Sequence, residues 1–267
     1  MAFLQCNIHS NALEMETVIN VILPHDRAPK SFARPFKVLY LHHGYSDNAS
    51  AWVRNTSVER YSWLYNVAVV MPEVQHSFGV DMDSGMKYFK YVSEELPNLC
   101  TDMFNISKKR EDTLVAGLSM GGYVALKCAI SHPERFSCCA SFSGVTDVVS
   151  RIGALDSAEW RKEKAAIFGM EKQITLENDV HLLTKKLAKE SLKKGSKIKL
   201  PKILLTCGKD DFLYQDNLTY CDLMANLPYD FKFMDWEGCH NWDFWDESIK
   251  IMMKYFLDNK KRVKKNV

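Results

Sequence analysis

The residues best suited to chemistry form the segment GLSMGG at 117–122, which contains a Gly-x-Ser-x-Gly motif. Apolar residues at 112–116 predict a strand before the motif, and residues 123–130 predict a helix after it. In such a strand-to-helix turn a serine hydroxyl is exposed, and the flanking glycines allow strand and helix to pack closely. The pattern makes Ser119 a candidate nucleophile. A glycine-rich turn with an ordinary helix-start serine fits the motif alone equally well.

The start of the predicted helix offers free backbone N–H groups and a positive dipole end to an oxyanion. The Met120 N–H is the first expected donor. Upstream, a strand predicted over 36–41 runs into HHGY at 42–45. A His-Gly turn at this place commonly supplies the second oxyanion donor of a serine hydrolase, here the Tyr45 N–H. A plain glycine turn at Gly44 is the alternative.

A serine nucleophile needs a base and a carboxylate that orients the base. A buried strand predicted over 201–207 ends in the segment GKDDFL, which places two aspartates at a strand end. We prefer Asp211 as the carboxylate and keep Asp210 as the fallback, because the residues alone do not separate them. Paired aspartates after a strand are also common turn and helix-capping residues.

The candidate base is His240, which follows a predicted edge strand at 230–236 whose alternation suggests one buried face. His240 is therefore expected on a loop, where a rigid scaffold can hold it over the sheet edge as a general base. The chain has eight histidines, so a lone loop histidine means little by itself. His240 is preferred because it completes the order Ser, Asp, His of α/β-hydrolases.

These segments together resemble the esterase D and tributyrin-type esterases of the α/β-hydrolase superfamily. The resemblance is carried by four stretches that span most of the chain: LHHGYSDN at 41–48 with Trp52, GLSMGGY at 117–123, GKDDFLY at 208–214 and HNWDFW at 240–245.

The resemblance implies that Ser119, Asp211 and His240 form a catalytic triad. It favours Asp211 over Asp210, because the acid of this family occupies the third position after the glycine of its motif. The chain departs from the family pattern in the doubled histidine before Gly44 and in Asn241 after His240. Neither departure removes a required group.

The alternation of apolar strands and helices predicts an α/β fold, with further buried strands at 67–71 and 136–141 and an antiparallel amino-terminal edge. The resemblance implies the α/β-hydrolase fold, with a mostly parallel central sheet and helices on both faces. We expect one domain over 1–267, since 46% of its residues are hydrophobic. Residues 147–195 predict a small helical insertion. It follows a strand's carboxyl end, where such sheets bind ligands, so it is either a cap or a solvated decoration.

Composition favours a small-molecule substrate. The formal net charge is only +2, so we expect no nucleic-acid or membrane partner. The basic run at 260–265 is interpreted as a frayed, solvated terminus. No cysteine or histidine spacing indicates a metal, and no cofactor is expected. The start of the chain lacks the pattern of a secretory signal, and the eight cysteines are expected as reduced thiols, so the predicted location is the cytoplasm.

The functional hypothesis is a serine carboxylesterase that hydrolyses short-chain acyl esters through an acyl-enzyme, the substrate class that the resemblance implies. Its alternatives are a thioesterase like S-formylglutathione hydrolase, a feruloyl or cinnamoyl esterase, and an inactive α/β-hydrolase scaffold. Trp52 and Gly44 are the predicted substrate-binding residues, although aromatic residues more often serve only in packing. Self-association is a further possibility, because members of this family often form oligomers.

Overall fold

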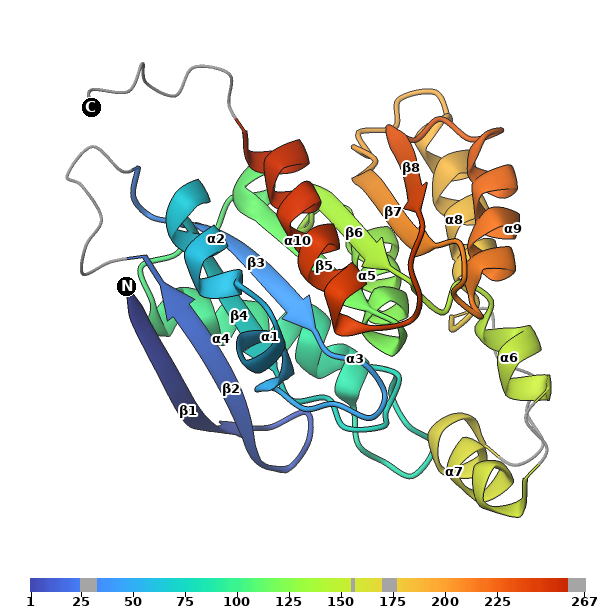
Figure 1. Ribbon diagram of the computed structural model, residues 1–267, viewed down its shortest axis with the longest axis horizontal. Coiled ribbons are helices and arrows are strands. Elements are labelled where there is room, and N and C mark those ends of the chain that lie inside the picture. The colour runs from blue at the N-terminus through green and yellow to red at the C-terminus, as the bar shows by residue number, and fades with distance from the viewer. Residues whose placement is uncertain (25–32, 155–156, 170–176, 259–267) are drawn as a thin grey trace.

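A computed structural model describes residues 1–24, 33–154, 157–169 and 177–258 of the protein (Figure 1). Within them, eight strands form one sheet in the order β1-β2-β4-β3-β5-β6-β7-β8. The strands are β1 (Ala2–Ser10), β2 (Met15–Leu23), β3 (Lys37–His42), β4 (Val67–Pro72), β5 (Thr113–Leu118), β6 (Cys138–Phe142), β7 (Lys202–Gly208) and β8 (Phe231–Trp236).

The sheet is parallel except at its amino-terminal edge. β2 pairs antiparallel with both β1 and β4, and every other neighbouring pair is parallel. The predicted antiparallel edge and the α/β-hydrolase architecture are therefore confirmed, and β8 lies at the other edge as expected. All residues of β4 and β5 are buried, which explains their continuous apolar sequences, because a central parallel strand is covered on both faces.

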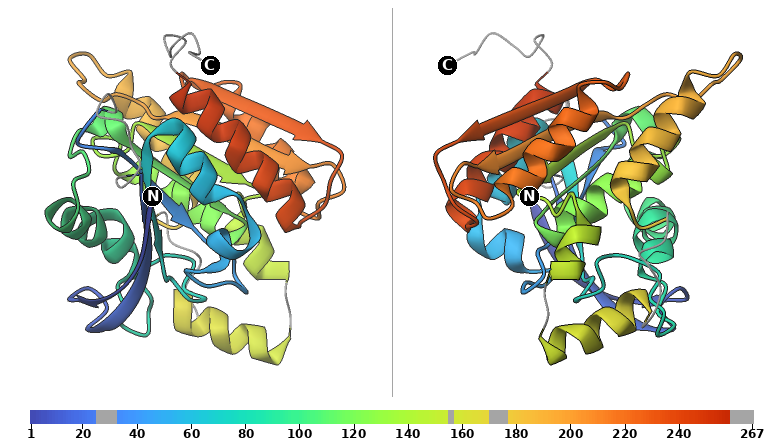
Figure 2. Two further views of the ribbon diagram at one scale, coloured as in Figure 1. Left: turned by 60° about the vertical axis from the view of Figure 1, so that its left-hand side comes forward. Right: turned by 90° about the vertical axis from the view of Figure 1, so that its right-hand side faces the viewer.

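Helices cover both faces of the sheet (Figure 2). One hydrophobic cluster joins the sheet to α4, α5, α8 and α9, and a second joins it to α1, α2 and α10. The α-helices are α1 (Ala51–Asn55), α2 (Val58–Tyr65), α3 (Tyr88–Lys90), α4 (Leu96–Met103), α5 (Met120–Ser131), α6 (Val148–Ala154), α7 (Ala158–Phe168), α8 (Val180–Ser191), α9 (Tyr214–Met224) and α10 (Trp242–Leu257), with a π-helical turn at Tyr91–Glu95 and a 3₁₀ turn at Arg110–Asp112.

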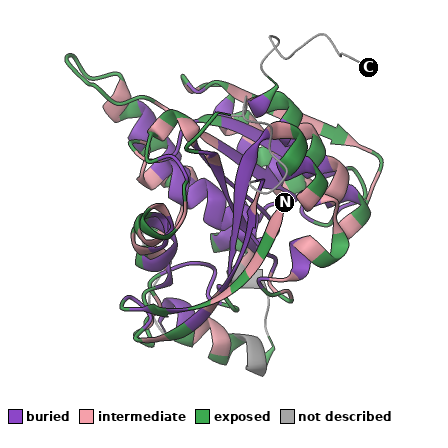
Figure 3. Ribbon diagram, turned by 90° about the vertical axis from the view of Figure 1, so that its left-hand side faces the viewer, coloured by how far each residue is buried: buried purple, intermediate pink, exposed green. Residues whose placement is uncertain are grey.

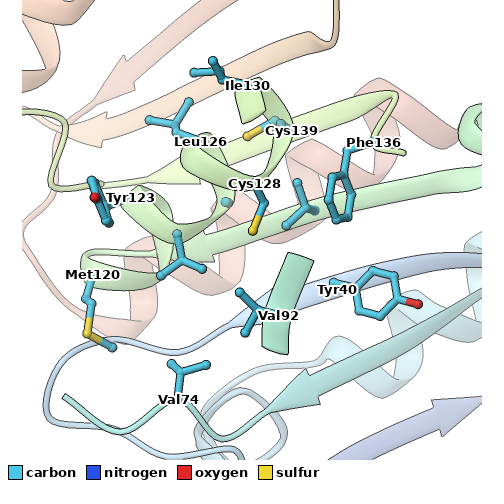
Figure 4. Packing of buried hydrophobic residues seen from close by; sticks show 14 of the residues in the cluster. Tyr40, Val74, Val92, Met120, Tyr123, Leu126, Cys128, Ile130, Phe136 and Cys139 are labelled. Carbon is cyan, nitrogen blue, oxygen red and sulfur yellow. The ribbon is translucent and has the colours of Figure 1, made fainter. Parts of the chain in front are cut away.

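The centre of the molecule is the most deeply buried part, as the colouring of the sheet in Figure 3 shows. Helix α5 lies within it, and eleven of its residues are buried, from Met120 to Ile130. Met120, Tyr123 and Leu126 belong to the same packed cluster as Val74 and Val92 from other elements (Figure 4). A helix enclosed in this way gives the residue at its start a fixed position.

The segment 147–195 contains three helices among its described residues, α6, α7 and α8. Helix α8 packs on α5 and buries Val180, Leu187 and Ala188, so it covers the sheet as the other helices do. Helices α6 and α7 lie beyond the carboxyl ends of the parallel strands (Figure 1). Among the described residues of this segment, α6 and α7 are therefore the candidates for a cap over this end of the sheet. The basic run at 260–265 lies outside the described residues.

Candidate active site

Ser119 lies between the last residue of β5 and the first residue of α5. Its backbone has φ 53° and ψ −118°, a conformation that L-residues seldom adopt, and its N–H donates to the Phe142 carbonyl at 2.9 Å. Such backbone strain persists only where the surrounding structure enforces it, and it is concentrated at functional sites. The turn therefore has the geometry expected of a nucleophile elbow.

Two glycines allow this turn to form. A Cβ atom on Gly117 would lie 2.3 Å from the Gly121 carbonyl oxygen, and a Cβ on Gly121 would lie 2.5 Å from the His42 carbonyl oxygen. Both neighbours are backbone atoms, which cannot move aside as a side chain can. The glycines of the motif are thus required by the close approach of β3, β5 and α5, as the sequence predicts.

His240 comes from the loop between β8 and α10, as predicted. Its Nε2 lies 3.0 Å from Ser119 Oγ across 121 positions of sequence. The imidazole packs between two aromatic rings, with centroid distances of 4.6 Å to Phe212 and 4.9 Å to Trp245. These rings restrict the imidazole to an orientation from which it can accept the proton of the serine hydroxyl.

Asp211 follows β7 and contacts the other side of the imidazole. Its Oδ2 lies 2.8 Å from His240 Nδ1, and its Oδ1 lies 3.1 Å from the same nitrogen. The carboxylate therefore accepts the Nδ1 proton, which leaves Nε2 to accept from Ser119. Burial opposes ionisation of the carboxyl, but the hydrogen bonds from His240 and the Leu213 N–H outweigh it and hold the pKa of Asp211 below its usual value.

The neighbouring Asp210 occupies a different position. Its backbone N–H donates to the Gly238 carbonyl at 3.0 Å, and the residue is exposed, whereas the Asp211 side chain has no exposed surface. The geometry thus favours Asp211 as the orienting carboxylate, in agreement with the choice made from the sequence.

The loop after β3 lies beside the nucleophile. A Cβ on Gly44 would lie 2.6 Å from Leu118 Cδ1, one residue before Ser119. The Gly44 carbonyl accepts from His43 Nδ1 at 2.7 Å and from the Asp47 N–H at 3.2 Å. Because the C=O and N–H of a trans peptide point in opposite directions, these bonds direct the Tyr45 N–H away from His43 and Asp47.

The doubled histidine has a structural role that the sequence did not reveal. His43 is 1% exposed, and its Nε2 accepts from the Val74 N–H at 3.1 Å while Nδ1 holds the Gly44 carbonyl. His42 is fully buried, and this burial together with the neighbouring His43 lowers its pKa to about 3. The His43 ring therefore supports the loop that follows β3. The position of His43 directly before Gly44 was the only available signal.

Trp52 lies entirely inside the protein. Its indole N–H donates to the His42 carbonyl at 2.9 Å, and its ring packs edge-on against Phe142 and Trp242. With no exposed surface, Trp52 has no access to a bound substrate in this conformation. Its position favours packing, the alternative noted from the sequence, and gives it a part in holding the end of β3. Gly44 is also buried, but its backbone lies at the site.

The described residues contain no group of three or more His, Cys, Asp or Glu side chains that could hold a metal ion. None of their helices combines the length and the apolar character needed to cross a bilayer.

Comparison with known proteins identifies close relatives over nearly the whole chain. The family model described as Putative esterase matches residues 10–256. An acetyl esterase of Caldicellulosiruptor saccharolyticus is 34% identical over 262 residues, which cover 93% of this chain and 96% of that protein. The match therefore extends well beyond the catalytic motifs.

Solved structures also match nearly the whole chain. The fluorophosphonate-binding serine hydrolase F of Staphylococcus aureus has a TM-score of 0.85 and 33% identity, covering 97% of this chain and 99% of that chain. The S-formylglutathione hydrolase of the same organism has a TM-score of 0.83 and 32% identity, covering 96% and 99%. A ferulic acid esterase of Anaeromyces mucronatus shares the fold. It is 16% identical to this chain with a TM-score of 0.66, and the match covers 95% of this chain and 89% of that chain. The chain belongs to the Putative esterase family of α/β-hydrolases and is a serine hydrolase of carboxylic esters.

Proposed function

We propose that this protein hydrolyses short-chain acyl esters, acetyl esters above all, with Ser119, His240 and Asp211 as its catalytic triad. The observation that carries the proposal is the continuous hydrogen-bonded path from Ser119 Oγ through His240 to the buried Asp211 carboxylate. A hydroxyl is a weak nucleophile until an adjacent base accepts its proton, and this path provides the base together with the group that orients it.

In the acylation step, Ser119 Oγ attacks the ester carbonyl carbon while its proton passes to His240 Nε2. The negative charge that develops on the carbonyl oxygen is stabilised by the N–H groups of Met120 and Tyr45. The carbon–oxygen bond to the alcohol then breaks, and the imidazolium gives its proton to the departing alkoxide. Asp211 remains ionised and stabilises the imidazolium throughout.

Deacylation repeats the sequence with water. His240 takes a proton from a water molecule as the water oxygen attacks the acyl carbon. The bond from that carbon to Ser119 Oγ then breaks, and the imidazolium returns its proton to Oγ, which releases the carboxylic acid and restores the hydroxyl. The route uses no metal or cofactor. The preference for acetyl groups rests on the acetyl esterase of Caldicellulosiruptor saccharolyticus, which is 34% identical to this chain.

Thioester hydrolysis is a second candidate, because an S-formylglutathione hydrolase is 32% identical to the chain. The same triad would act on a thioester carbonyl. Comparing kcat/KM for matched acetyl esters and acetyl thioesters separates the two candidates. A feruloyl esterase activity has weaker support, since the ferulic acid esterase compared above shares only the fold.

The proposed function is tested by hydrolysis of p-nitrophenyl acetate, butyrate and octanoate with the wild-type protein and with Ser119→Ala. We expect the rate to fall by at least about 10³-fold in the variant and to be highest for acetate in the wild type. Circular dichroism controls for folding. Equal rates for the two proteins would refute Ser119 as the nucleophile, and a preference for octanoate would refute the short-chain assignment.

Two properties of the whole protein are also proposed. We propose a cytoplasmic location, supported by eight cysteines that are all free, four of them buried. Self-association is proposed from the family resemblance alone. Cell fractionation and light scattering of the purified protein test these two statements.

A further inference from the structure

Helix α7 reaches the loop that carries the proposed second oxyanion donor. Glu163 Oε1 on α7 lies 2.7 Å from His76 Nδ1. The His76 ring stacks on the Tyr45 ring with centroids 4.1 Å apart and planes 19° apart. A residue of the inserted segment is thus connected, through one imidazole, to the residue whose backbone N–H would face the substrate carbonyl.

A second contact joins the same residues. The Tyr45 hydroxyl forms a hydrogen bond with Glu163, and burial together with this bond and the nearby carboxylate charge raises the pKa of Tyr45 well above its ordinary value. Glu163 therefore holds the tip of the Tyr45 side chain and the ring that covers it. Both contacts restrict rotation of Tyr45 about its own backbone.

Helix α7 is itself seated on the protein near the site. The carbonyls of Ala166 and Ile167 accept from the N–H groups of Ser84 and Asp83, each at 3.1 Å. These bonds satisfy carbonyls at the end of the helix, which would otherwise lack partners. Ile167 and Phe168 are 2% and 6% exposed, so the end of α7 is anchored by burial as well.

An aromatic cluster continues from this anchor toward the nucleophile. The Phe78 ring lies 6.0 Å from Phe168 on α7, 5.8 Å from Tyr45 and 6.1 Å from Tyr123. Tyr123 is on α5, four residues after Ser119. Phe78 thus packs against α7, against the loop that carries Tyr45 and against α5. The position of Tyr45 depends on residues from all three.

The stability of the fold does not require the contacts of Glu163. The side chains of His76 and Glu163 are 54% and 32% exposed, and ion pairs of this kind contribute little to folding. The contacts of Glu163 instead restrain Tyr45, a half-buried residue followed by the exposed Ser46. The backbone of such a loop is free to shift unless side chains hold it, and a small displacement of an oxyanion donor costs rate.

We propose that Glu163 is a positioning residue for ester hydrolysis: by holding Tyr45 and His76 it fixes the Tyr45 amide in the oxyanion hole, so that seating of α7 completes the catalytic site. The inference rests on the proposed function, since it concerns the transition state of that reaction. It gives the helical insertion a part in the chemical step.

The test compares Glu163→Ala, Glu163→Gln and Tyr45→Phe with the wild type, using p-nitrophenyl acetate. We expect Glu163→Ala to lower kcat about tenfold with KM nearly unchanged, since the lost interaction acts in the transition state. Glu163→Gln keeps an oxygen that accepts hydrogen bonds and should lose only about threefold. Lys162→Ala, an exposed change on the same helix, is the matched control and should keep the wild-type rate.

A transition-state analogue gives a readout that a purely structural role would not change. An alkyl trifluoromethyl ketone adds to the serine and places an oxyanion in the hole. Its inhibition constant should rise by the same factor by which kcat/KM falls in each Glu163 variant. In the Tyr45→Phe background, Glu163→Ala should cost less than it does in the wild type, because the two changes remove a shared contact.

The outcomes separate this inference from the proposed function. If the wild type hydrolyses no ester, both the proposed function and the positioning role of Glu163 are refuted. If hydrolysis depends on Ser119 but Glu163→Ala keeps the wild-type kcat, or raises KM alone, the positioning role is refuted and the esterase function stands. Should Glu163→Ala fail to fold, Glu163→Gln and Tyr45→Phe provide the same comparison, and wild-type inhibition constants in both would refute the proposal.

Discussion

The candidate triad and the loop that carries Tyr45 are held in place by different kinds of contact. Ser119, Asp211 and His240 all follow parallel strands of the central sheet, and Asp211 has no exposed side-chain surface. Tyr45 lies on a loop whose outer side is held by the half-exposed pair His76 and Glu163. The fold itself thus positions the proposed proton-transfer groups, whereas the proposed stabilisation of the oxyanion depends on helix α7.

Removing the orienting carboxylate should have the largest effect. Asp211→Asn leaves a side chain of the same size but no longer favours a proton on Nδ1 of His240, so Nε2 is not free to accept from Ser119. We expect kcat to fall by about 10⁴-fold. Steady-state hydrolysis of p-nitrophenyl acetate measures the effect. Asp210→Asn is the matched control, and a comparable loss in that variant would contradict the assignment of the acid.

A buried lysine on α5, the helix that follows Ser119, predicts a dependence of stability on pH. Lys127 on α5 is 3% exposed, donates to Asn178 Oδ1 at 2.7 Å and lies 4.0 Å from the centre of the Phe89 ring. Burial lowers its pKa to about 8, against about 10.4 in an unfolded chain. Between these values the unfolded state binds more protons, so this lysine makes the free energy of unfolding rise with pH.

The variant Lys127→Met removes this titration. Between pH 7 and pH 10, the free energy of unfolding of the wild type should rise relative to that of the variant by about 1–3 kcal/mol. Urea unfolding at several pH values measures both proteins, and their difference cancels the contributions of the buried cysteines. Curves that stay parallel over this range would show that Lys127 is charged in the native state up to its ordinary pKa.

The smallest expected effect is the change in the free energy of unfolding when the Glu163 side chain is removed. Glu163→Ala should change the free energy of unfolding by less than about 1 kcal/mol, because its ion pair with His76 is partly exposed. The same variant is expected to lose about tenfold in kcat, so function and stability separate here. A drop of several kcal/mol in urea unfolding would mean that Glu163 supports the fold rather than Tyr45.

The candidate triad could be chosen from the sequence because its signals are local. The glycines around Ser119 are required by the close approach of neighbouring backbone atoms. Asp211 lies just after β7, where its carboxylate accepts from the nearby Leu213 N–H. The alternation of strands and helices predicted an α/β fold, and the family resemblance implied the α/β-hydrolase architecture. The chosen residues Ser119, Asp211 and His240 lie within hydrogen-bond distance in the structure.

The contacts around the loop that carries Tyr45 could not be predicted in the same way. Glu163 and His76 are 87 positions apart, and nothing in either neighbourhood indicates that they meet. Trp52 was expected at the substrate, but an indole beside a catalytic loop in sequence can equally pack beneath it, as it does here. Helix α8 has the lysine-rich composition of a solvated segment, yet its apolar face packs on α5.

The most direct test of the central claim is covalent labelling of the folded protein with a fluorophosphonate, followed by peptide mass spectrometry. An activated serine attacks the phosphorus and displaces fluoride, so the label should be found on Ser119 at one equivalent per chain. Labelling should be abolished in Ser119→Ala and strongly slowed in Asp211→Asn. A label on another residue, or a wild-type protein that does not react, would contradict the assignment of Ser119, His240 and Asp211 as the catalytic triad.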